Sequence, residues 1–300
     1  MVQPSYLELY RSGKLANRAK KAYQILKNCK LCPHHCQVDR TQDELGYCKT
    51  GKEIKVASFG PHFGEEPPLV GQRGSGTIFF SSCNLRCIYC QNYDTSHQQQ
   101  GELINTRELA EIMISLQRQG CHNINFVTPS HMIHTLLAAT LEACKLGLEI
   151  PLVYNSGGYD NLTGLNLLDG VIDIYMPDIK YADEEIGLKY SEVPKYLSVV
   201  KKAVKEMYRQ VGELKTELDI AYQGLLIRHL VLPDNLAGSQ EIMEFISYEL
   251  SPDTYINIME QYYPAYQAGE DKHLNRRITE REYQQTLHLA KKAGLQRIEG

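Results

Sequence analysis

Seven of the nine cysteines of this 300-residue chain fall into two groups, which is its strongest chemical signal. One group, in the segment SSCNLRCIYCQN, consists of Cys83, Cys87 and Cys90. Three thiolates on one short loop suit an iron–sulfur cluster or a zinc ion. Because a four-iron cluster needs four ligands, three cysteines leave one iron open to a ligand from outside the protein. An open metal position is typical of a reactive site rather than a structural one.

The other group, in CKLCPHHC and the GYC that follows, has four cysteines: Cys29, Cys32, Cys36 and Cys48. Four thiolates are enough to close a tetrahedral zinc site or to hold a second iron–sulfur cluster. An iron–sulfur cluster here would serve electron delivery, whereas zinc would serve structure only. Free thiols without metal are the third interpretation, and the sequence does not choose among the three. Cys121 and Cys144 stand alone on apolar stretches, so we expect them to be core residues.

From residue 76 onward, short apolar runs alternate with longer amphipathic segments. The short runs predict strands buried on both faces, at Thr77–Phe80, Asn123–Val127, Pro151–Tyr154, Val171–Tyr175, Leu225–Val231 and Tyr255–Met259. Helical patterns lie between them, several beginning at a Ser, Thr or Asn cap and ending at Gly. Six strand–helix units in a row predict an α/β fold with a parallel sheet and right-handed crossovers. A complete eight-unit barrel needs about 250 residues, so residues 76–300 favour an open, partial (β/α)6 barrel, with a flat doubly wound sheet as the alternative.

The residues before this barrel form a separate unit in our interpretation. Residues 1–28 keep a helical period, and residues 29–75 are expected to be irregular, because they hold the four cysteines and a Gly- and Pro-rich stretch. The predicted organisation is therefore an N-terminal helical, cysteine-rich, metal-binding extension over residues 1–75, followed by the partial barrel over residues 76–300.

Composition limits the partners and the compartment. The formal net charge is −4, so no basic excess argues for binding to nucleic acid. The amino terminus lacks the apolar core of a signal peptide, and no apolar run approaches the roughly 18 residues of a membrane span. We therefore expect a cytoplasmic protein without nucleic-acid or membrane partners, whose cysteines serve thiol or metal chemistry rather than disulfides.

Polar groups follow or interrupt each predicted strand near its carboxyl end: Cys83, Thr128, His131, Asn155, Asp178, Lys180, Arg228, His229 and Gln261. Parallel α/β sheets build their binding and catalytic sites at that edge. We therefore expect these residues to surround one site together with the three-cysteine loop. A histidine at a strand end is more often a hydrogen-bonded core residue, so His131, His134 and His229 are weighed as either cavity-facing or core residues.

The cysteine spacing C-x3-C-x2-C, with Tyr89 just before the last cysteine and a strand before the first, resembles the radical S-adenosylmethionine (SAM) superfamily. The resemblance implies a [4Fe-4S] cluster whose open iron is chelated by the amino and carboxylate groups of SAM. It also implies that the reduced cluster donates one electron, that the sulfonium C–S bond breaks, and that a 5′-deoxyadenosyl radical takes hydrogen from a substrate.

A longer series of motifs, from about residue 29 to the end, is similar to the proteins related to pyruvate formate-lyase activating enzyme. The motifs occur in the order CxLCPxxC, GEEPP, NINFVTPSH, PLVYNSGGY, DIYMPDIKY, LLIRHLVLP and INIMEQYYP. This resemblance implies an activase of a glycyl-radical enzyme, with a protein or peptide substrate and a one-electron donor such as flavodoxin or ferredoxin. The alternatives are a radical SAM enzyme that modifies a different protein or a small molecule, and a non-catalytic iron–sulfur or zinc protein. The open three-cysteine site argues against the last.

The resemblance also implies roles for single residues. Cys83, Cys87 and Cys90 match the cluster ligands, and the remaining matches concern SAM: Tyr89 beside the adenine, Asn155 near the ribose or methionyl end, Asp178 and Lys180 on the methionyl amino and carboxylate groups, and Arg228 as a second carboxylate partner. The alternative interpretation is that Asp178 and Lys180 form a solvent-exposed ion pair, which would contribute little free energy.

Two positions depart from the superfamily pattern. After the second predicted strand, VTPSH stands where a glycine pair and an acidic residue are usual, which leaves Thr128 or main-chain carbonyls as weak acceptors for the methionyl amino group. Gln261 and Tyr262 stand where activating enzymes often carry a histidine.

Overall fold

Parallel strands form the centre of the sheet in the computed structural model, which describes residues 2–300. In chain order they are β2 (Ser75–Phe80), β4 (Ile124–Val127), β5 (Leu152–Ser156), β6 (Ile174–Pro177), β8 (Ile220–Leu230) and β9 (Tyr255–Met259). Each pairs in parallel with the next, so all six predicted strands are confirmed. Strand β6 begins three residues later than predicted, because the amides of Val171 and Ile172 donate to the Leu168 carbonyl in a turn.

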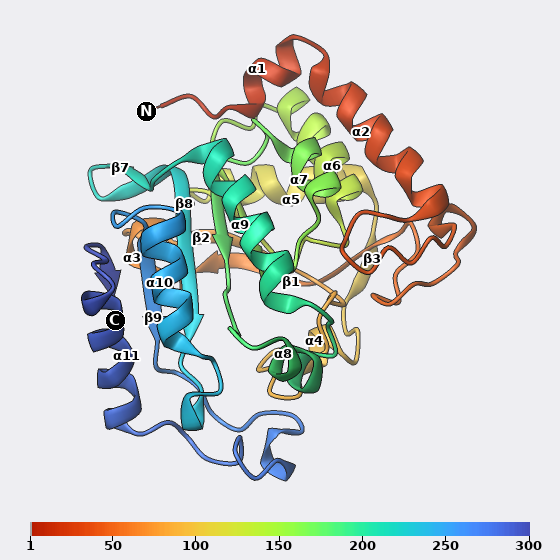
Figure 1. Cartoon of the computed structure of the whole chain (residues 1–300). Coiled ribbons are helices and arrows are strands. Elements are labelled where there is room, and N and C mark those ends of the chain that lie inside the picture. The colour runs from red at the N-terminus through yellow and green to blue at the C-terminus, as the bar shows by residue number, and fades with distance from the viewer. Residues whose placement is uncertain (1) are drawn as a thin grey trace.

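Helices cover the outer side of this sheet (Figure 1). They are α5 (Thr106–Arg118), α6 (Ile133–Lys145), α7 (Leu162–Leu168), α8 (Glu184–Ser191), α9 (Tyr196–Val211), α10 (Ser239–Glu249) and α11 (Glu280–Lys292). Two of them begin as the sequence suggests. Asn105 and Thr279 each form a capping box with the glutamate three residues later. Parallel strands joined by outer helices confirm the α/β fold with a partial (β/α)6 barrel.

The first part of the chain holds more regular structure than its composition suggests. Helix α1 (Tyr6–Arg11) and helix α2 (Lys14–Ile25) are separated at Gly13, whose φ of 72° ends the first helix, and α2 packs on α6. The prediction of an irregular segment over residues 29–75 is wrong for β1 (Ile54–His62), which pairs antiparallel with β2 and with β3 (Glu102–Ile104). Gly60 and Pro61 predict a turn, but Pro61 lies in the part of β1 that β3 does not flank, where proline is tolerated. The division at residue 75 stays a prediction.

The connection between β1 and β2 enters the barrel and closes it at the amino ends of the strands. It contains the short helix α3 (Pro67–Val70), whose Leu69 is fully buried. Leu69 packs in one apolar cluster with inward-facing residues of β5, β6 and β8, including Val153, Ile174 and Leu226. Asn123 Nδ2 donates to the Leu69 carbonyl at 2.9 Å. This connection therefore fills the interior of the barrel at the amino ends of the strands, and the cavity described in the next section lies at their carboxyl ends.

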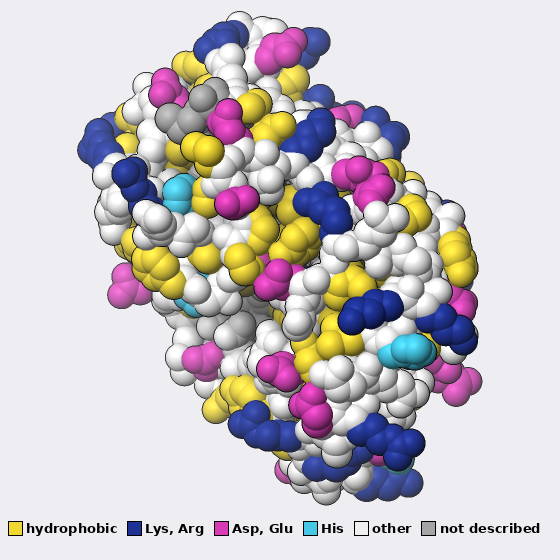
Figure 2. Space-filling model, turned by 90° about the vertical axis from the view of Figure 1, so that its left-hand side faces the viewer, with side chains coloured by type: hydrophobic (Ala, Val, Ile, Leu, Met, Phe, Trp, Pro, Cys, Tyr) yellow, Lys and Arg dark blue, Asp and Glu magenta, His cyan; other side chains and the backbone are white. Residues whose placement is uncertain are grey.

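The remaining elements are short: α4 (Tyr93–Ser96), β7 (Lys215–Glu217), which pairs antiparallel with β8, and β10 (Ile298–Glu299), which pairs parallel with β9. Across residues 2–300, every helix is too short or too polar to cross a membrane. Acidic and basic side chains are interspersed on the face of the molecule seen in Figure 2.

Candidate active site

A cavity of about 250 Å³ opens at the carboxyl ends of the parallel strands. Alternation along the strands turns every second side chain into it, as at Phe79, Val127 and Met259. The lining includes nearly every site residue predicted from the sequence: Cys83, Cys87, Tyr89, Cys90, Thr128, Asn155, Asp178, Lys180, Arg228 and Gln261. The predicted convergence at one edge of the sheet is therefore observed, whereas the binding roles of these residues stay predictions.

The three-cysteine loop forms one wall of the cavity, and each of its sulfurs has a hydrogen-bonding neighbour. The Leu85 amide donates to Cys83 Sγ at 3.3 Å, Cys87 Sγ lies 2.9 Å from Ser191 Oγ, and Cys90 Sγ lies 3.1 Å from Ser96 Oγ. Burial raises the pKa of the Cys83 thiol to about 12 and that of Cys87 to about 11. These two thiols therefore stay protonated at neutral pH unless a cation takes the place of their protons, as happens when cysteines bind a metal. Donors next to sulfur are the neighbours that tune an iron–sulfur cluster.

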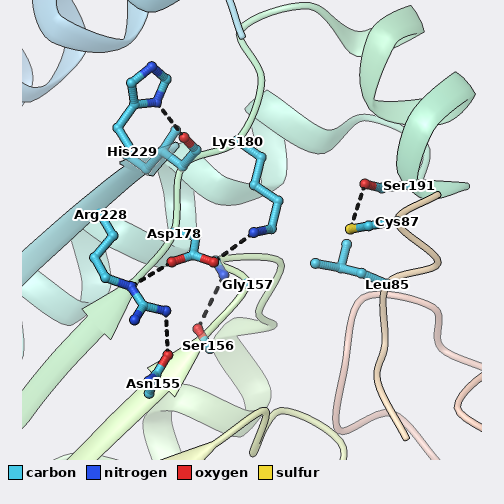
Figure 3. Close-up of polar contacts among 12 residues, drawn as sticks. Leu85, Cys87, Asn155, Ser156, Gly157, Asp178, Lys180, Ser191, Arg228 and His229 are labelled. Carbon is cyan, nitrogen blue, oxygen red and sulfur yellow. Dashed lines mark hydrogen bonds and ion pairs between the residues drawn. The ribbon is translucent and has the colours of Figure 1, made fainter. Parts of the chain in front are cut away.

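Opposite the loop, four side chains form one charged network (Figure 3). Asp178 accepts from Lys180 Nζ at 2.6 Å and from Arg228 Nε at 2.8 Å, and Arg228 Nη2 donates to Asn155 Oδ1 at 2.7 Å. Asp178 and Lys180 are each only 14% exposed, so the interpretation of a surface ion pair is wrong.

Electrostatics keep this network charged. Burial raises the pKa of the Asp178 carboxyl, but the Arg228 and Lys180 cations together hold it below its ordinary value. Burial lowers the pKa of Lys180, but the Asp178 carboxylate raises it above the ordinary value of a lysine. The network therefore presents both a carboxylate and cations to the cavity, and a zwitterionic amino-acid group needs partners of both signs.

Two buried glutamates near Arg228 were missed by the sequence reasoning, although their motif GEEPP was noticed. Arg228 Nη1 lies 3.5 Å from Glu65 Oε2, and Arg228 Nε lies 4.0 Å from Glu66 Oε1. Glu66 Oε1 also accepts from Asn257 Nδ2 at 2.9 Å. The sequence did hold a signal for them. The two acids directly precede Pro67 and Pro68, which form the first turn of α3, a position where proline is favoured. These acids hold the Arg228 guanidinium from below.

Tyr89 is fixed by a chain of hydroxyl contacts that ends at a cysteine. Tyr89 Oη and Tyr181 Oη lie 2.6 Å apart, and Tyr181 Oη lies 2.8 Å from Ser191 Oγ, which contacts Cys87 Sγ. The Tyr262 ring packs edge-on against Tyr89, with ring centroids 5.9 Å apart. The aromatic wall of the cavity is therefore held rigidly beside the cysteine loop.

Thr128 adopts a backbone conformation that glycine usually provides. Its φ is 59°, and its amide donates to the Asn155 carbonyl at 2.9 Å. A β-branched residue with positive φ is an outlier. The chain therefore keeps a left-handed turn at this position without glycine and holds backbone strain at the cavity wall.

Three candidate histidines lie outside the cavity lining. His229 Nδ1 is 2.8 Å from the Ile179 carbonyl, and Figure 3 shows its ring turned away from Asp178. His131 Nε2 lies 3.0 Å from the Ser81 carbonyl. Burial lowers the pKa of His131 and His134 to about 3 and that of His229 to about 4, so all three are neutral core residues. The cavity-facing interpretation is wrong and the core interpretation is confirmed. His97 lines the cavity instead, with Nε2 at 3.1 Å from the Cys87 carbonyl.

The four N-terminal thiols lie near one another. Burial raises the pKa of Cys32, and the charges of the other three thiols raise it further. The Tyr47 amide donates to Cys36 Sγ at 3.2 Å, and Cys48 Sγ lies 2.9 Å from Thr50 Oγ1. Within residues 2–300, His, Cys, Asp and Glu side chains nowhere form a group of three or more placed to hold a single metal ion. Since zinc binds sulfur at about 2.3 Å, a zinc ion would require these thiols to move together.

Comparisons with known protein sequences and structures show which proteins this chain is similar to. The sequence model of the radical SAM superfamily matches residues 77–246, more than half of the chain. An uncharacterized protein of Methanocaldococcus jannaschii is 35% identical, with 97% of this chain and 82% of that protein covered.

The solved structures that are similar in fold have low sequence identity to this chain. The FeFe-hydrogenase maturase HydG from Carboxydothermus hydrogenoformans is similar with a TM-score of 0.50 at 12% identity, over 96% of this chain and 65% of that one. This chain thus spans just under two thirds of that protein, and the likeness shows the fold alone. A domain of pyruvate-formate lyase-activating enzyme from Bacteroides vulgatus has a TM-score of 0.36 at 16% identity, over 65% of this chain and 91% of that one, which is too low to argue from. The family model, which matches more than half of the chain, shows that the chain belongs to the radical SAM superfamily.

Proposed function

We propose that this protein is a radical SAM activase, which removes hydrogen from a glycine of a partner protein. The observation that supports the radical SAM chemistry is the convergence of three thiols and a buried, charge-paired network on one cavity. In this proposal Cys83, Cys87 and Cys90 hold the [4Fe-4S] cluster that membership of the superfamily implies.

The chemistry of the network supports SAM as the second cofactor. The methionyl end of SAM carries one carboxylate and one ammonium group. Lys180 and Arg228 would hold the carboxylate, and Asp178 would accept from the amino group, so each polar group of the methionyl end would meet a partner of opposite charge in the buried site. Asn155 fixes Arg228 from one side, and Glu65 and Glu66 approach it from below.

The other lining residues support the same assignment. Tyr89 would lie beside the adenine, held by its contact with Tyr181. Phe79, Val127 and Met259 give the cavity an apolar wall that keeps water from the reacting atoms. When bound and reduced, the cluster would supply the single electron that reductive cleavage of SAM requires.

The activase assignment rests on the run of motifs from CxLCPxxC to INIMEQYYP. Its test is anaerobic reconstitution with iron and sulfide, addition of SAM and a reductant, and incubation with purified pyruvate formate-lyase and other glycyl-radical enzymes. We expect a glycyl radical signal in electron paramagnetic resonance on one of them. SAM cleavage without a glycyl radical on any of them would overturn the activase assignment and favour a different protein or a small molecule as substrate.

We also propose a second metal centre at Cys29, Cys32, Cys36 and Cys48. Its support is the proximity of the four thiols and the donors beside Cys36 and Cys48. Metal analysis of a variant with Cys83, Cys87 and Cys90 replaced by Ala should still find bound iron or zinc. A folded, metal-free variant would leave the N-terminal cysteines as free thiols.

A further inference from the structure

Two segments far apart in the sequence meet at the opening of the cavity. One is residues 91–97, directly after the three-cysteine loop, and the other is residues 261–267, shortly after β9. Gln91 Nε2 donates to the Gln261 carbonyl at 3.1 Å, and both residues line the cavity while they stay exposed. Exposed residues in a cavity lining mark its opening, so these two segments form the rim of the site.

An aromatic stack joins the two segments. The rings of Tyr93 and Tyr266 are stacked with centroids 5.3 Å apart, and the His97 ring lies 4.6 Å from that of Tyr266. Tyr93 and Tyr266 are 37% and 41% exposed, so part of each side chain is open to a ligand. Tyr266 has a φ of 52°, which is an outlier for a bulky residue, and backbone strain of this kind is concentrated at functional sites. The stack therefore has both the exposure and the strained backbone of a binding surface.

The segment that carries Tyr266 is fixed from both sides. The Gln267 amide donates to the Ile88 carbonyl of the three-cysteine loop at 2.9 Å, and Tyr262 Oη donates to the Leu274 carbonyl at 2.6 Å. A surface that is held in place in advance loses less conformational entropy when it binds a ligand. The stack is therefore preorganised for binding.

The hydrogen-bonding groups at the rim are uncharged. The charged lining residues Asp178, Lys180 and Arg228 pair with one another inside the cavity. Asn92 and Gln261 also line the cavity, and their side-chain amides have no hydrogen-bond partner within residues 2–300. A primary amide offers both N–H donors and a carbonyl acceptor, which are the partners that a peptide group needs. The rim therefore suits a neutral polypeptide main chain better than a charged metabolite.

The size of the cavity limits what else can enter it. Its volume of about 250 Å³ is below the range of about 300–1,000 Å³ that is typical of pockets for one drug-sized ligand. SAM, which the proposed function places in this cavity, would fill it. A substrate could then put only its reacting atoms into the cavity, and the rest of the substrate would lie across the rim.

We propose that the rim binds an extended, uncharged segment of a partner protein, and that a glycine of this segment enters the cavity. Asn92 and Gln261 bond its peptide groups, and the stack of Tyr93 and Tyr266 holds an apolar side chain next to the glycine. Glycine suits this entry because it has no side chain to keep its Cα from the reacting atoms. Main-chain bonds give such recognition its affinity, and the neighbouring side chain gives its specificity. The inference rests on the proposed activase function and adds to it the chemistry of the segment that is recognised.

Peptide binding tests the rim without any turnover. The probe is a short, fluorescently labelled peptide with capped ends, a central glycine and an adjacent phenylalanine, and the comparison peptide carries glutamate in place of the phenylalanine. Fluorescence anisotropy is measured on reconstituted full-length protein that holds SAM, in the absence of a reductant. We expect the phenylalanine peptide to bind several-fold more tightly than the glutamate peptide. Equal affinities, or no binding of either peptide, would overturn the inference.

Substitutions at Tyr266 test the stack. Tyr266→Asn removes the ring but keeps a residue type that tolerates positive φ, whereas Tyr266→Phe keeps the ring. We expect Tyr266→Asn to weaken binding of the phenylalanine peptide several-fold, and Tyr266→Phe to bind it like the wild type. The matched control is Tyr248→Asn, because Tyr248 is an exposed tyrosine of α10 outside the cavity lining. Unchanged peptide affinity in Tyr266→Asn would sink the role of the stack.

A substitution at Asn92 tests recognition of the main chain. Asn92→Asp keeps the shape of the side chain but replaces its N–H donors by a carboxylate oxygen. We expect several-fold weaker binding of the phenylalanine peptide, and the affinity for SAM is measured alongside. A loss of peptide binding that only follows a loss of SAM would overturn the role of the rim. Peptide binding at the rim without a glycyl radical on any partner protein would overturn the activase function instead.

Discussion

The substitution Lys180→Met tests whether the charged network binds SAM. Methionine keeps most of the length of lysine but carries no charge, so the methionyl carboxylate would lose one of its two cations. Removing one partner of a desolvated charge pair costs about 2–5 kcal/mol. Because Arg228 stays in place as the second cation, with its side chain 17% exposed, we expect the lower part of that range. A loss of about 2–3 kcal/mol is roughly a 30-fold to 150-fold loss of affinity.

The assay is an equilibrium titration with SAM under anaerobic conditions, at equal iron content in every variant. Asp178→Asn should weaken binding more than Lys180→Met, because it leaves two buried cations without their shared carboxylate. The matched control is Lys201→Met on the outer helix α9, where Lys201 pairs with Glu249 at 2.8 Å on the surface and is worth less than about 1 kcal/mol. Near wild-type SAM affinity in both Lys180→Met and Asp178→Asn would refute the role of the network.

Three further predictions concern stability. His131, His134 and His229 are neutral in the fold at pKa values of about 3, 3 and 4, but they take up protons when unfolded below their ordinary pKa of 6.5. The fold is therefore not penalised by these histidines above pH 6.5, and it loses stability as the pH falls towards 4, by an amount on the order of a few kcal/mol for each histidine; thermal melts that do not change between pH 7 and pH 4 would contradict this. Thr128→Gly should raise the melting temperature, because the strain of about 1–3 kcal/mol exceeds the entropic cost of glycine of about 0.5–1 kcal/mol; a lower melting temperature would show that the turn is unstrained. Leu69→Ala should lower the free energy of unfolding in urea by about 2–5 kcal/mol. A loss below about 1 kcal/mol would mean that Leu69 of α3 does not fill the barrel interior.

The strands of the barrel were predictable because each is a short apolar run bounded by turn residues, and β9 was predicted at its observed bounds, Tyr255–Met259. Strand β1 was not, because Gly60 and Pro61 interrupt its pattern and because its pairing with β2 is a tertiary contact. The edge of the sheet that carries the site was also predictable, since parallel strands all end on the same side.

Side-chain direction was less predictable, since one residue of register decides which face a strand residue occupies. Arg228 and His229 are neighbours on β8, but Arg228 points into the cavity and His229 into the core. The burial of the Glu65, Glu66 and Arg40 side chains depends on connections that lack a periodic pattern, so the sequence could show their charges but not their surroundings.

The most direct test of the account is the reductive cleavage of SAM by the anaerobically reconstituted protein and by its variant with Cys83, Cys87 and Cys90 replaced by Ala. With dithionite as reductant, the wild type should release methionine and 5′-deoxyadenosine in equal amounts, and the variant should release neither. Continued release of both products by the variant would contradict the assignment of these cysteines as the ligands of the reactive cluster.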